Sequence, residues 1–335
     1  MSINMQQARI LLTGVGGFIG FHLTRRLNLA GATVLGVDNL NTYYDVHLKE
    51  ARLAELSRLE RFTFSRVDIV DRAAMMGAFA EFRPDFVVHL AAQAGVRYSI
   101  EQPHAFSRSN LEGFLTVLEA CRAHPVRHLI YASSSSVYGT NSSVPFREDD
   151  PVEQPVSLYA ATKRANELMA RTYAHLYDIP SSGLRFFTVY GPWGRPDMAY
   201  FSFTKAILAG ESIPVFNRGR MRRDFTYVDD VTESIVRLVN KPPSDAGLSD
   251  AGGAPHTIYN VGNHTPVELD QFIAAIEKAC GRKAQRRNLP MQSGDVPVTY
   301  AEISRLNAVT GFSPATSIED GIERFVSWYR NYYNI

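Results

Sequence analysis

The sequence has little of what marks several classes of protein. Its only cysteines, Cys121 and Cys280, show neither metal-site spacing nor a disulfide framework, so we expect no metal. No apolar run reaches the roughly 20 residues of a membrane-spanning helix. The first residues lack the charged and apolar regions of a signal peptide, which predicts a cytoplasmic location. The formal net charge of +1 gives no argument for a nucleic acid or a membrane as partner.

What the chain does have is a regular alternation of segments. Over the first 190 residues, short apolar runs alternate with longer amphipathic ones, which predicts a parallel sheet with helices on both faces. This is the pattern of a doubly wound α/β fold. The predicted strands are residues 8–13, 33–37, 62–67, 86–91, 128–132 and 182–187. The predicted helices are residues 18–29, 51–59, 72–82, 105–123 and 158–177.

The alternation breaks after Pro192. The turn-rich segment GPWGRP leads into a helix, a short strand and a basic loop, while a strand predicted at residues 258–261 again suits the parallel sheet. We therefore expect two units with a discontinuous boundary. The larger comprises residues 1–187 and about 225–262, and a smaller C-terminal α/β lobe comprises about 188–224 and 263–335.

The first predicted strand runs directly into a glycine-rich loop. Gly14, Gly17 and Gly20 keep a G-x-x-G-x-x-G frame ahead of an amphipathic helix. Such glycines allow a tight turn against a pyrophosphate, which the N-terminus of the helix binds through its free N–H groups. A glycine-rich loop alone is also an ordinary turn, but here a strand and a helix flank it. The larger unit is thus predicted to be a dinucleotide-binding domain of the Rossmann type.

The choice of dinucleotide depends on Asp38, which ends the second predicted strand 18 residues after Gly20. A carboxylate there binds the adenosine ribose hydroxyls and repels a 2′-phosphate, so the predicted cofactor is NAD. The alternative is that Asp38 is only a strand-end turn residue. Further residues predicted to border NAD lie in the glycine loop, near strand ends and in one helix. They are Phe18, Ile19, Asn39, Asn41, Asp68, Ile69, Leu90, Ala91, Ala92, Gln93 and Asn110.

Tyr159 and Lys163 stand four residues apart at the start of a predicted helix, so they share one face. A phenol with a pKa near 10 is a poor base, but a nearby ammonium and an oxidised nicotinamide would lower that pKa. Tyr159 would then take a proton from a substrate hydroxyl while hydride leaves its carbon. Lys163 would also hold the nicotinamide ribose. Taken alone, the pair is more typical of a surface helix, and its value comes from the elements that precede it.

A run of four serines at residues 133–136 follows the fifth predicted strand. The carboxyl end of an inner strand opens onto the same cleft as the dinucleotide, and a hydroxyl there can assist proton transfer. A serine-rich turn is the alternative, but it does not explain why the run stands at this end of an inner strand.

With these pieces in view, the chain resembles the extended short-chain dehydrogenase/reductases, and among them the nucleotide-sugar epimerases, over essentially its whole length. The matching segments are TGVGGFIG (13–20), DNL (38–40), DI (68–69), LAAQAGVRYS (90–99), NLEG (110–113), SSSSVYG (133–139), YAATK (159–163), LRFF (184–187) and RDFTYVDD (223–230).

The resemblance implies roles for individual residues. Ser134 matches the catalytic serine, and Tyr159 and Lys163 match the catalytic pair. Arg223 is similar to the arginine that meets the UDP phosphates, and Asp295 to a ribose ligand. Further implied substrate contacts are Arg97, Thr188, Val215, Phe216 and Gln292. UDP-glucose 4-epimerases usually have asparagine at Thr188 and arginine at Gln292, so Arg223 or Arg282 is expected to carry more of the phosphate charge.

Two segments point to the sugar. GPWGRPDMA (191–199) and Tyr43-Tyr44-Asp45 are most similar to UDP-glucuronate 4-epimerases. Arg195 would bind the C6 carboxylate of a uronic acid bidentately, although a phosphate contact or a solvated arginine is the alternative. Related decarboxylases and dehydratases carry an acidic residue where this chain has Ser135 and Ser136, which favours epimerisation without elimination.

The expected reaction is therefore conversion of UDP-glucuronate to UDP-galacturonate through a 4-keto sugar, with Tyr159 as acid and base and with tightly bound NAD. A UDP-glucose or UDP-N-acetylglucosamine 4-epimerase is an alternative that changes only the sugar pocket. A non-catalytic NAD-binding sensor is another, but such proteins typically lose the tyrosine or the lysine. We also expect a homodimer through the helices at 105–123 and 158–177, the second of which carries the apolar residues Leu168, Met169, Tyr173 and Leu176.

Overall fold

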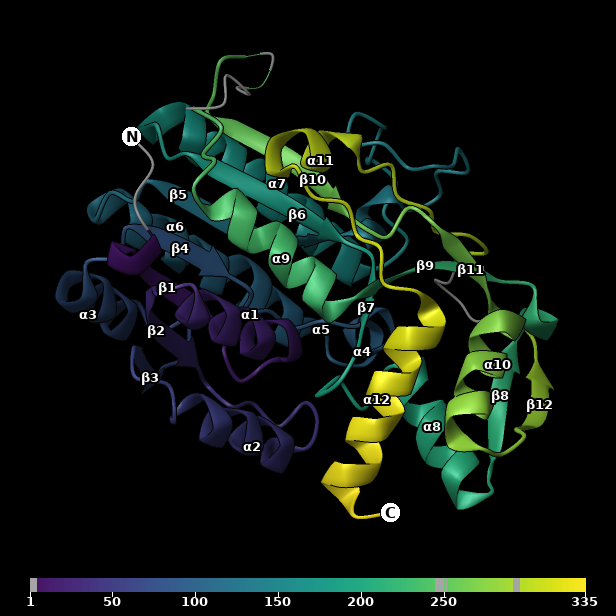
Figure 1. The fold of residues 1–335 in the computed structure, drawn as a ribbon. Coiled ribbons are helices and arrows are strands. Elements are labelled where there is room, and N and C mark those ends of the chain that lie inside the picture. The colour runs from purple at the N-terminus through teal and green to yellow at the C-terminus, as the bar shows by residue number, and fades with distance from the viewer. Residues whose placement is uncertain (1–4, 245–249, 251, 292–295) are drawn as a thin grey trace.

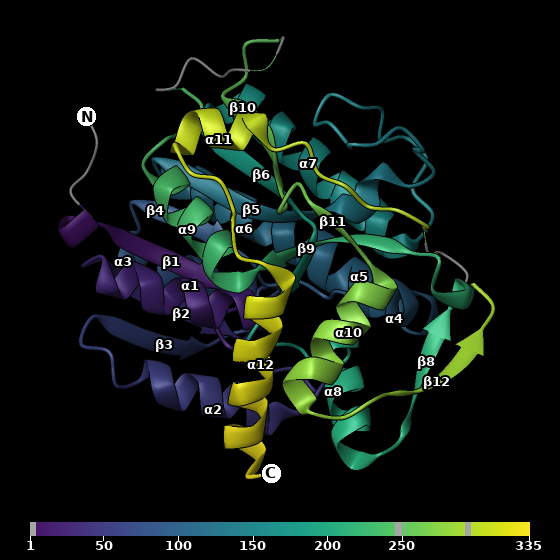
Figure 2. The ribbon, with the colours of Figure 1, turned by 45° about the vertical axis from the view of Figure 1, so that its right-hand side comes forward.

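The computed structural model describes residues 5–244, 250, 252–291 and 296–335. It confirms the predicted α/β class: a central seven-stranded parallel sheet, covered by helices on both faces, lies beside a smaller lobe (Figures 1 and 2). In spatial order the strands are β10 (His256–Val261), β6 (Ser181–Phe186), β5 (His128–Ser134), β4 (Phe86–His89), β1 (Arg9–Thr13), β2 (Thr33–Asp38) and β3 (Phe62–Arg66).

The strand order places the ligand-binding edge of the sheet. From β1 the chain adds β2 and β3 on one side, then crosses to add β4 on the other side of β1. The loops that follow β1 and β4 therefore diverge, and open α/β sheets bind ligands outside the carboxyl ends of the strands at such a point. The inner strands are almost wholly buried, as their apolar runs predict, whereas the edge strand β3 is only partly buried.

Two sets of helices cover the sheet. One apolar cluster joins α1 (Phe18–Leu29), α2 (Val46–Leu56) and α9 (Val228–Val239) to one face. A second cluster joins α3 (Arg72–Phe82), α6 (Gly113–Ala123) and α7 (Leu158–Tyr177) to the other face. α2 begins five residues before the predicted residue 51, because the Asp45 carboxylate accepts a hydrogen bond from the His47 N–H and caps it.

The helix predicted at 105–123 is confirmed, since the chain is helical without a gap from Pro103 to Ala123, but its hydrogen-bonding pattern changes along the way. α5 (Pro103–Phe106) passes through a π-helical turn (Ser107–Glu112) into α6, and a separate short helix, α4 (Val96–Glu101), precedes it. Inside this turn the Asn110 carbonyl accepts a hydrogen bond from the Asn166 side chain of α7, at 2.6 Å. Such π turns often occur at functional sites, and this one directs Asn110 toward the loop after β4.

The smaller lobe is built from short strands and three helices. Its elements are α8 (Ala199–Ala209), β8 (Ser212–Phe216), α10 (Leu269–Cys280), β12 (Gln285–Leu289) and α12 (Ile318–Tyr333). Between it and the main sheet lie β7 (Thr188–Tyr190), β9 (Arg222–Tyr227) and β11 (Pro266–Glu268), while α11 (Ser304–Thr310) packs on α9 and β10. The predicted basic loop is therefore wrong where β9 forms, because β7 and β11 supply hydrogen-bonding partners on both sides of it.

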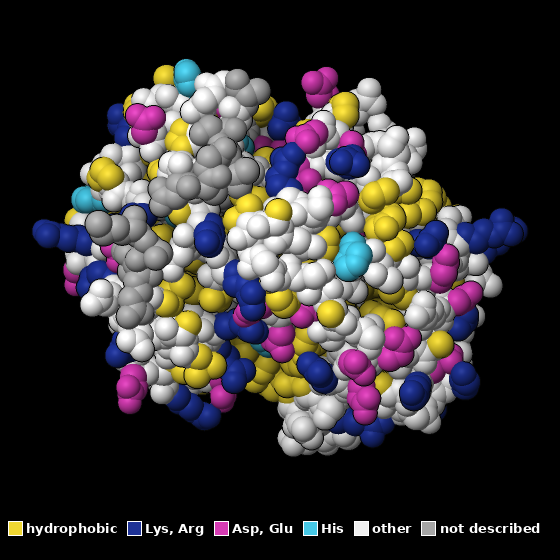
Figure 3. Space-filling view, turned by 45° about the horizontal axis from the view of Figure 1, so that its top comes forward, with side chains coloured by type: hydrophobic (Ala, Val, Ile, Leu, Met, Phe, Trp, Pro, Cys, Tyr) yellow, Lys and Arg dark blue, Asp and Glu magenta, His cyan; other side chains and the backbone are white. Residues whose placement is uncertain are grey.

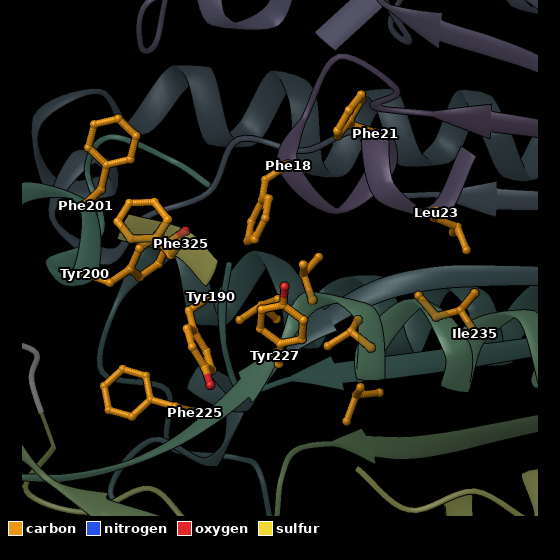
Figure 4. Packing of buried hydrophobic residues seen from close by; sticks show 14 of the residues in the cluster. Phe18, Phe21, Leu23, Tyr190, Tyr200, Phe201, Phe225, Tyr227, Ile235 and Phe325 are labelled. Carbon is orange, nitrogen blue, oxygen red and sulfur yellow. The ribbon is translucent and has the colours of Figure 1, made fainter. Parts of the chain in front are cut away.

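The expected return of the chain to the main sheet is confirmed, since β10 pairs in parallel with β6. The two units nevertheless share one apolar core. Phe18 and Phe21 of α1, Tyr227 at the end of β9 and Phe325 of α12 belong to a single cluster (Figure 4). The domain limits at about residues 187, 225 and 262 remain a proposal, because this packing is continuous across them.

The outer surface carries intermixed acidic and basic side chains on the face shown in Figure 3. On α7, Leu168 and Leu176 are 50% and 59% exposed, whereas Met169 and Tyr173 pack against the core beneath. The homodimer thus remains a prediction, now with two leucines available for contact. Among the described residues, no helix has the length and apolar character to cross a membrane, and no cluster of side chains could hold a metal ion.

Candidate active site

The glycine loop forms a tight turn between β1 and α1. Gly14 has a positive φ of 80°, and a Cβ added there would lie 2.7 Å from the Ala91 nitrogen. A Cβ at Gly20 would collide with the Gly14 carbonyl, so α1 can approach the turn closely only because this residue is glycine. The N-terminus of α1 then faces the cleft, and this arrangement fits a dinucleotide pyrophosphate.

Asp38 stands at the end of β2, beside this loop. Its Oδ2 accepts a hydrogen bond from the Gly16 N–H at 3.0 Å, and its Oδ1 accepts one from the Leu40 N–H at 2.8 Å. Each carboxylate oxygen can accept a further hydrogen bond, so the residue can hold ribose hydroxyls while it braces the glycine loop. Both features fit NAD.

The residues after β4 are fixed from two directions. The Leu90 and Ala91 N–H groups donate to the Thr13 carbonyl and hydroxyl, at 3.1 and 3.2 Å. The Asn110 amide meets the Gln93 backbone through both its atoms, at 2.8 and 3.0 Å, and also donates to the Thr162 hydroxyl at 3.0 Å. Asn110 was predicted to border the cofactor, but here it is committed to shaping the loop that does so.

The remaining predicted cofactor neighbours differ in how accessible they are. Asn39 and Asn41 lie half-buried in the loop after β2, and Ile19, Asp68 and Ala92 are half-buried as well. Phe18 and Ile69 are buried, with 5% and 6% of their surfaces exposed. Phe18 lies in the shared core, and Ile69 packs where a Cβ on Gly113 would stand. These two therefore support the site from below.

The structure brings Tyr159, Lys163 and Ser134 together at the carboxyl end of β5. The Ser134 hydroxyl is near enough to the Tyr159 phenol to act on its pKa. Burial raises the pKa of Tyr159, and the neighbouring Ser134 hydroxyl and the Arg195 charge offset part of that rise. The lowering expected from Lys163 is not found. Its ammonium donates to the Ala132 carbonyl at 2.9 Å, and burial lowers its own pKa to about 8.

Hydrogen bonds separate the roles of the serines. The Ser133 hydroxyl donates to Glu167 Oε1 at 2.6 Å and is therefore committed to that carboxylate. The Ser134 hydroxyl faces Tyr159 and also accepts the Ser136 N–H at 3.2 Å, which starts the short 3₁₀ helix of residues 135–138. Ser135 and Ser136 are half-buried in that helix, beside the catalytic side chains.

The sequence did not single out Glu167, which stands one helical turn beyond Lys163 on the same face of α7. It is 1% exposed and meets Arg185 through both carboxylate oxygens, at 2.8 and 3.0 Å. Arg164 adds a third contact at 3.0 Å. The spacing of Tyr159, Lys163 and Glu167 was the available signal for this residue.

Arg195 lies near the catalytic phenol but is already paired. Its Nε and NH2 donate to the Asp197 carboxylate at 3.0 and 2.6 Å, and its guanidinium lies 5.7 Å from the Tyr43 ring. The Tyr43 hydroxyl donates to Asp197 as well, at 3.1 Å. Burial opposes the charge on Arg195, but the Asp197 carboxylate outweighs it and raises the pKa of the guanidinium.

The other predicted substrate contacts spread toward the smaller lobe. Arg97 lies over the Phe216 ring at 5.5 Å, and Arg223 donates to the Pro297 carbonyl at 3.1 Å. Thr188 is half-buried and Val215 is 2% exposed. Arg282 donates to the Leu208 carbonyl at the end of α8. Gln292 and Asp295 lie outside the described residues.

Reasoning from sequence also missed Arg52, which is fully buried on α2. It donates to the Gly16 carbonyl of the glycine loop at 2.8 Å and to the Trp193 carbonyl at 2.6 Å. In the sequence, Arg52 stands in a helix with several charged residues, as a solvent-exposed arginine would. No local pattern shows that it is buried.

With this geometry in view, known proteins are informative. A probable UDP-glucuronate 4-epimerase of Rhizobium meliloti is 50% identical over 97% of this chain and 98% of its own. The structure of UDP-glucuronic acid 4-epimerase from Bacillus cereus with UDP-glucuronic acid and NAD matches with a TM-score of 0.87 and 31% identity, covering 97% of this chain and 100% of that one. That of a Thermotoga maritima UDP-glucose 4-epimerase with UDP-glucose matches at 0.84 and 28%, covering 97% and 99%.

A family model gives the same result over a large part of the chain. The model of the NAD dependent epimerase/dehydratase family matches residues 10–262, which include the glycine loop, Asp38 and the Tyr159–Lys163 pair. The chain therefore belongs to the NAD-dependent epimerase/dehydratase family, and NAD is its cofactor.

Proposed function

We propose that this nucleotide-sugar 4-epimerase interconverts UDP-glucuronate and UDP-galacturonate. The observation that supports the proposal is Arg195, a buried cation whose charge acts on the Tyr159 phenol and whose guanidinium is held by Asp197. A base that acts at C4 of a hexuronate stands one carbon from C5, which bears the carboxylate. A cation beside Tyr159 therefore suits an acidic sugar.

Tyr159 acts as both base and acid in this reaction. It removes the proton of the C4 hydroxyl, with the Ser134 hydroxyl near the phenol, and later returns that proton. NAD, which the glycine loop and Asp38 would hold, would supply the hydride acceptor and donor for C4, so that the sugar passes through a 4-ketone. Lys163, held by the Ala132 carbonyl, is placed to bind the nicotinamide ribose.

The keto form of a uronic acid is a β-keto acid, which can lose CO₂. Ser135 and Ser136 offer hydroxyls beside the reacting centre where elimination would need a stronger acid or base. Arg195 would hold the carboxylate in place and so disfavour the alignment that decarboxylation requires. We therefore infer epimerisation without loss of CO₂.

The activities of the relatives support this choice. The probable UDP-glucuronate 4-epimerase of Rhizobium meliloti is 50% identical to this chain, whereas the Thermotoga maritima UDP-glucose 4-epimerase is 28% identical. One observation favours a neutral sugar instead: the Arg195–Asp197 pair is complete without any ligand. A uronate would have to reach the remaining NH1 of Arg195, which bonds to none of the described residues.

The test is to incubate the purified protein with UDP-glucuronate and no added NAD, and to separate the products by chromatography. We expect UDP-galacturonate to accumulate to an equilibrium mixture. Stoichiometric release of CO₂ would show a decarboxylase. Turnover of UDP-glucose or UDP-N-acetylglucosamine, with none of UDP-glucuronate, would establish the neutral-sugar alternative.

A further inference from the structure

Arg52 is a fully buried arginine that no carboxylate neutralises within the described structure. Its guanidinium donates instead to three backbone carbonyls and to the Tyr44 hydroxyl, at 2.7 Å. Its Nε is buried and has no hydrogen-bond partner among the described residues. Burying an unpaired charge costs free energy, so a chain that retains one must gain something from its contacts.

Those contacts join two parts of the active site. On one side, NH1 donates to the Gly16 carbonyl at 2.8 Å, in the turn whose N–H is bonded to Asp38. On the other side, NH2 donates to the Trp193 and Gly194 carbonyls at 2.6 and 3.2 Å, directly before Arg195. One planar side chain thus connects the dinucleotide turn to the segment that carries the proposed carboxylate ligand.

The segment at residues 191–195 has reason to need such support. Trp193 has a positive φ of 60°, which is unfavourable for a residue other than glycine. A second side chain of the dinucleotide unit, His22 of α1, hydrogen-bonds the Pro192 carbonyl at 2.8 Å. Burial lowers the pKa of His22 to about 4, so at neutral pH an uncharged imidazole donates this bond. Three successive carbonyls are therefore held by side chains from α1 and α2.

We propose that Arg52 is a positioning residue that couples the glycine turn to the sugar-binding segment, so that NAD binding and nucleotide-sugar binding support each other. A planar guanidinium can serve carbonyls on both sides at once, whereas a lysine ammonium presents a single point of donation. The proposal needs only the cofactor and substrate sites of the family, and it does not depend on the sugar being a uronate.

The test compares Arg52→Met and Arg52→Lys with two control variants. Arg58→Met removes an exposed arginine just beyond α2, and Arg330→Met removes a hydrogen bond to the Cys280 carbonyl in the smaller lobe. For each protein we would measure the Kd for NAD, the KM and kcat for UDP-glucuronate and for UDP-glucose at saturating NAD, and Tm.

We expect Arg52→Met to weaken NAD binding and to raise the KM of the accepted sugar, each about tenfold or more, with a smaller change in kcat. Arg52→Lys should recover only part of either loss. Arg58→Met should change neither constant, and Arg330→Met should lower Tm alone. If Arg52→Met lowers Tm but leaves both the Kd and the KM at their original values, the proposal is wrong.

Should Arg52→Met fail to fold, Arg52→Lys and Tyr44→Phe carry the test. Tyr44→Phe removes the phenol that accepts from NH1 and should shift the NAD Kd and the sugar KM together, in the same direction and to a smaller extent. A shift in only one of the two constants would contradict coupling. Turnover of UDP-glucose without UDP-glucuronate would refute the proposed substrate, while the effect of Arg52 could still be measured on UDP-glucose.

Discussion

The catalytic side and the sugar side of the site are held in different ways. Tyr159, Lys163 and Ser134 stand on a helix and a strand end, and the buried Glu167–Arg185 pair lies directly beneath them. Arg195 stands on an irregular segment, which side chains from α1 and α2 hold through its backbone. From this difference we expect the regular fold to fix the redox chemistry, and the irregular segment before Arg195 to set the choice of sugar.

The strongest test of the catalytic side is Tyr159→Phe. Loss of the acid and base should lower kcat by about 10²- to 10⁴-fold while bound NAD is retained, since the ring remains. The measurement is the initial rate of product formation, together with the NAD content of the purified protein. Tyr173→Phe, at a half-buried tyrosine farther along the same helix whose hydroxyl donates to Glu119, should keep its activity. If the rate of Tyr159→Phe is close to that of the parent protein, Tyr159 is not the acid and base.

The support beneath the catalytic side is tested by Glu167→Gln. This change leaves Arg185 and Arg164 without a carboxylate inside the protein, and it should lower the free energy of unfolding by about 3–5 kcal/mol. Urea unfolding followed by circular dichroism measures it. The control is Glu119→Gln, because Glu119 pairs with Arg122 at the surface and should matter much less. If both variants lose the same free energy of unfolding, the buried Glu167–Arg185 pair stabilises the protein no more than a surface pair does.

The sugar side is tested by Arg195→Met. Removing the cation should raise KM for UDP-glucuronate by about 10- to 100-fold, because a charge-assisted hydrogen bond to the substrate is lost. KM for UDP-glucose, which has no carboxylate, should change little and serves as the internal control. A parallel rise for both substrates would instead assign Arg195 to the phosphates or to the shape of the segment.

The smallest expected effect is a dependence on pH. Burial lowers the pKa of Lys163 from its ordinary value to about 8, so its positive charge is present below that pH and is lost above it. Because the charged ammonium is expected to hold the nicotinamide ribose, kcat/KM should fall as the pH rises through about 8. In Lys163→Arg the descending limb should move to higher pH. If the descending limb of kcat/KM stays at the same pH in Lys163→Arg, a group other than Lys163 causes it.

Local patterns sufficed for much of the fold and for part of the site. The glycine turn, Asp38 and the Tyr159–Lys163 pair were predictable because each depends on residues close together in the sequence. Ser134 was chosen from the serine run by resemblance, and the hydrogen bond from Ser133 to Glu167 now gives a physical reason to set Ser133 aside. Their assignments as site residues remain predictions that the variants above can test.

Other features depend on partners far away in the chain. Arg52 contacts Trp193 across 141 positions of sequence, and a helical arginine carries no mark of such a contact. β9 was taken for a basic loop because its exposed arginines hide the pairing that β7 and β11 provide. Similarly, the π turn at Asn110 follows from a hydrogen bond with Asn166, which periodicity alone does not reveal.

The aromatic packing around Trp193 has a practical consequence for experiments. The sequence contains only two tryptophans, and Trp193 and Trp328 lie with their ring centroids 5.3 Å apart. Trp193 also touches Phe21 of α1, at 5.2 Å. Intrinsic emission excited at the indole band therefore arises from one spot, where the dinucleotide unit, the segment before Arg195 and the last helix meet. Ligand-dependent movement there can be followed optically in the unlabelled protein.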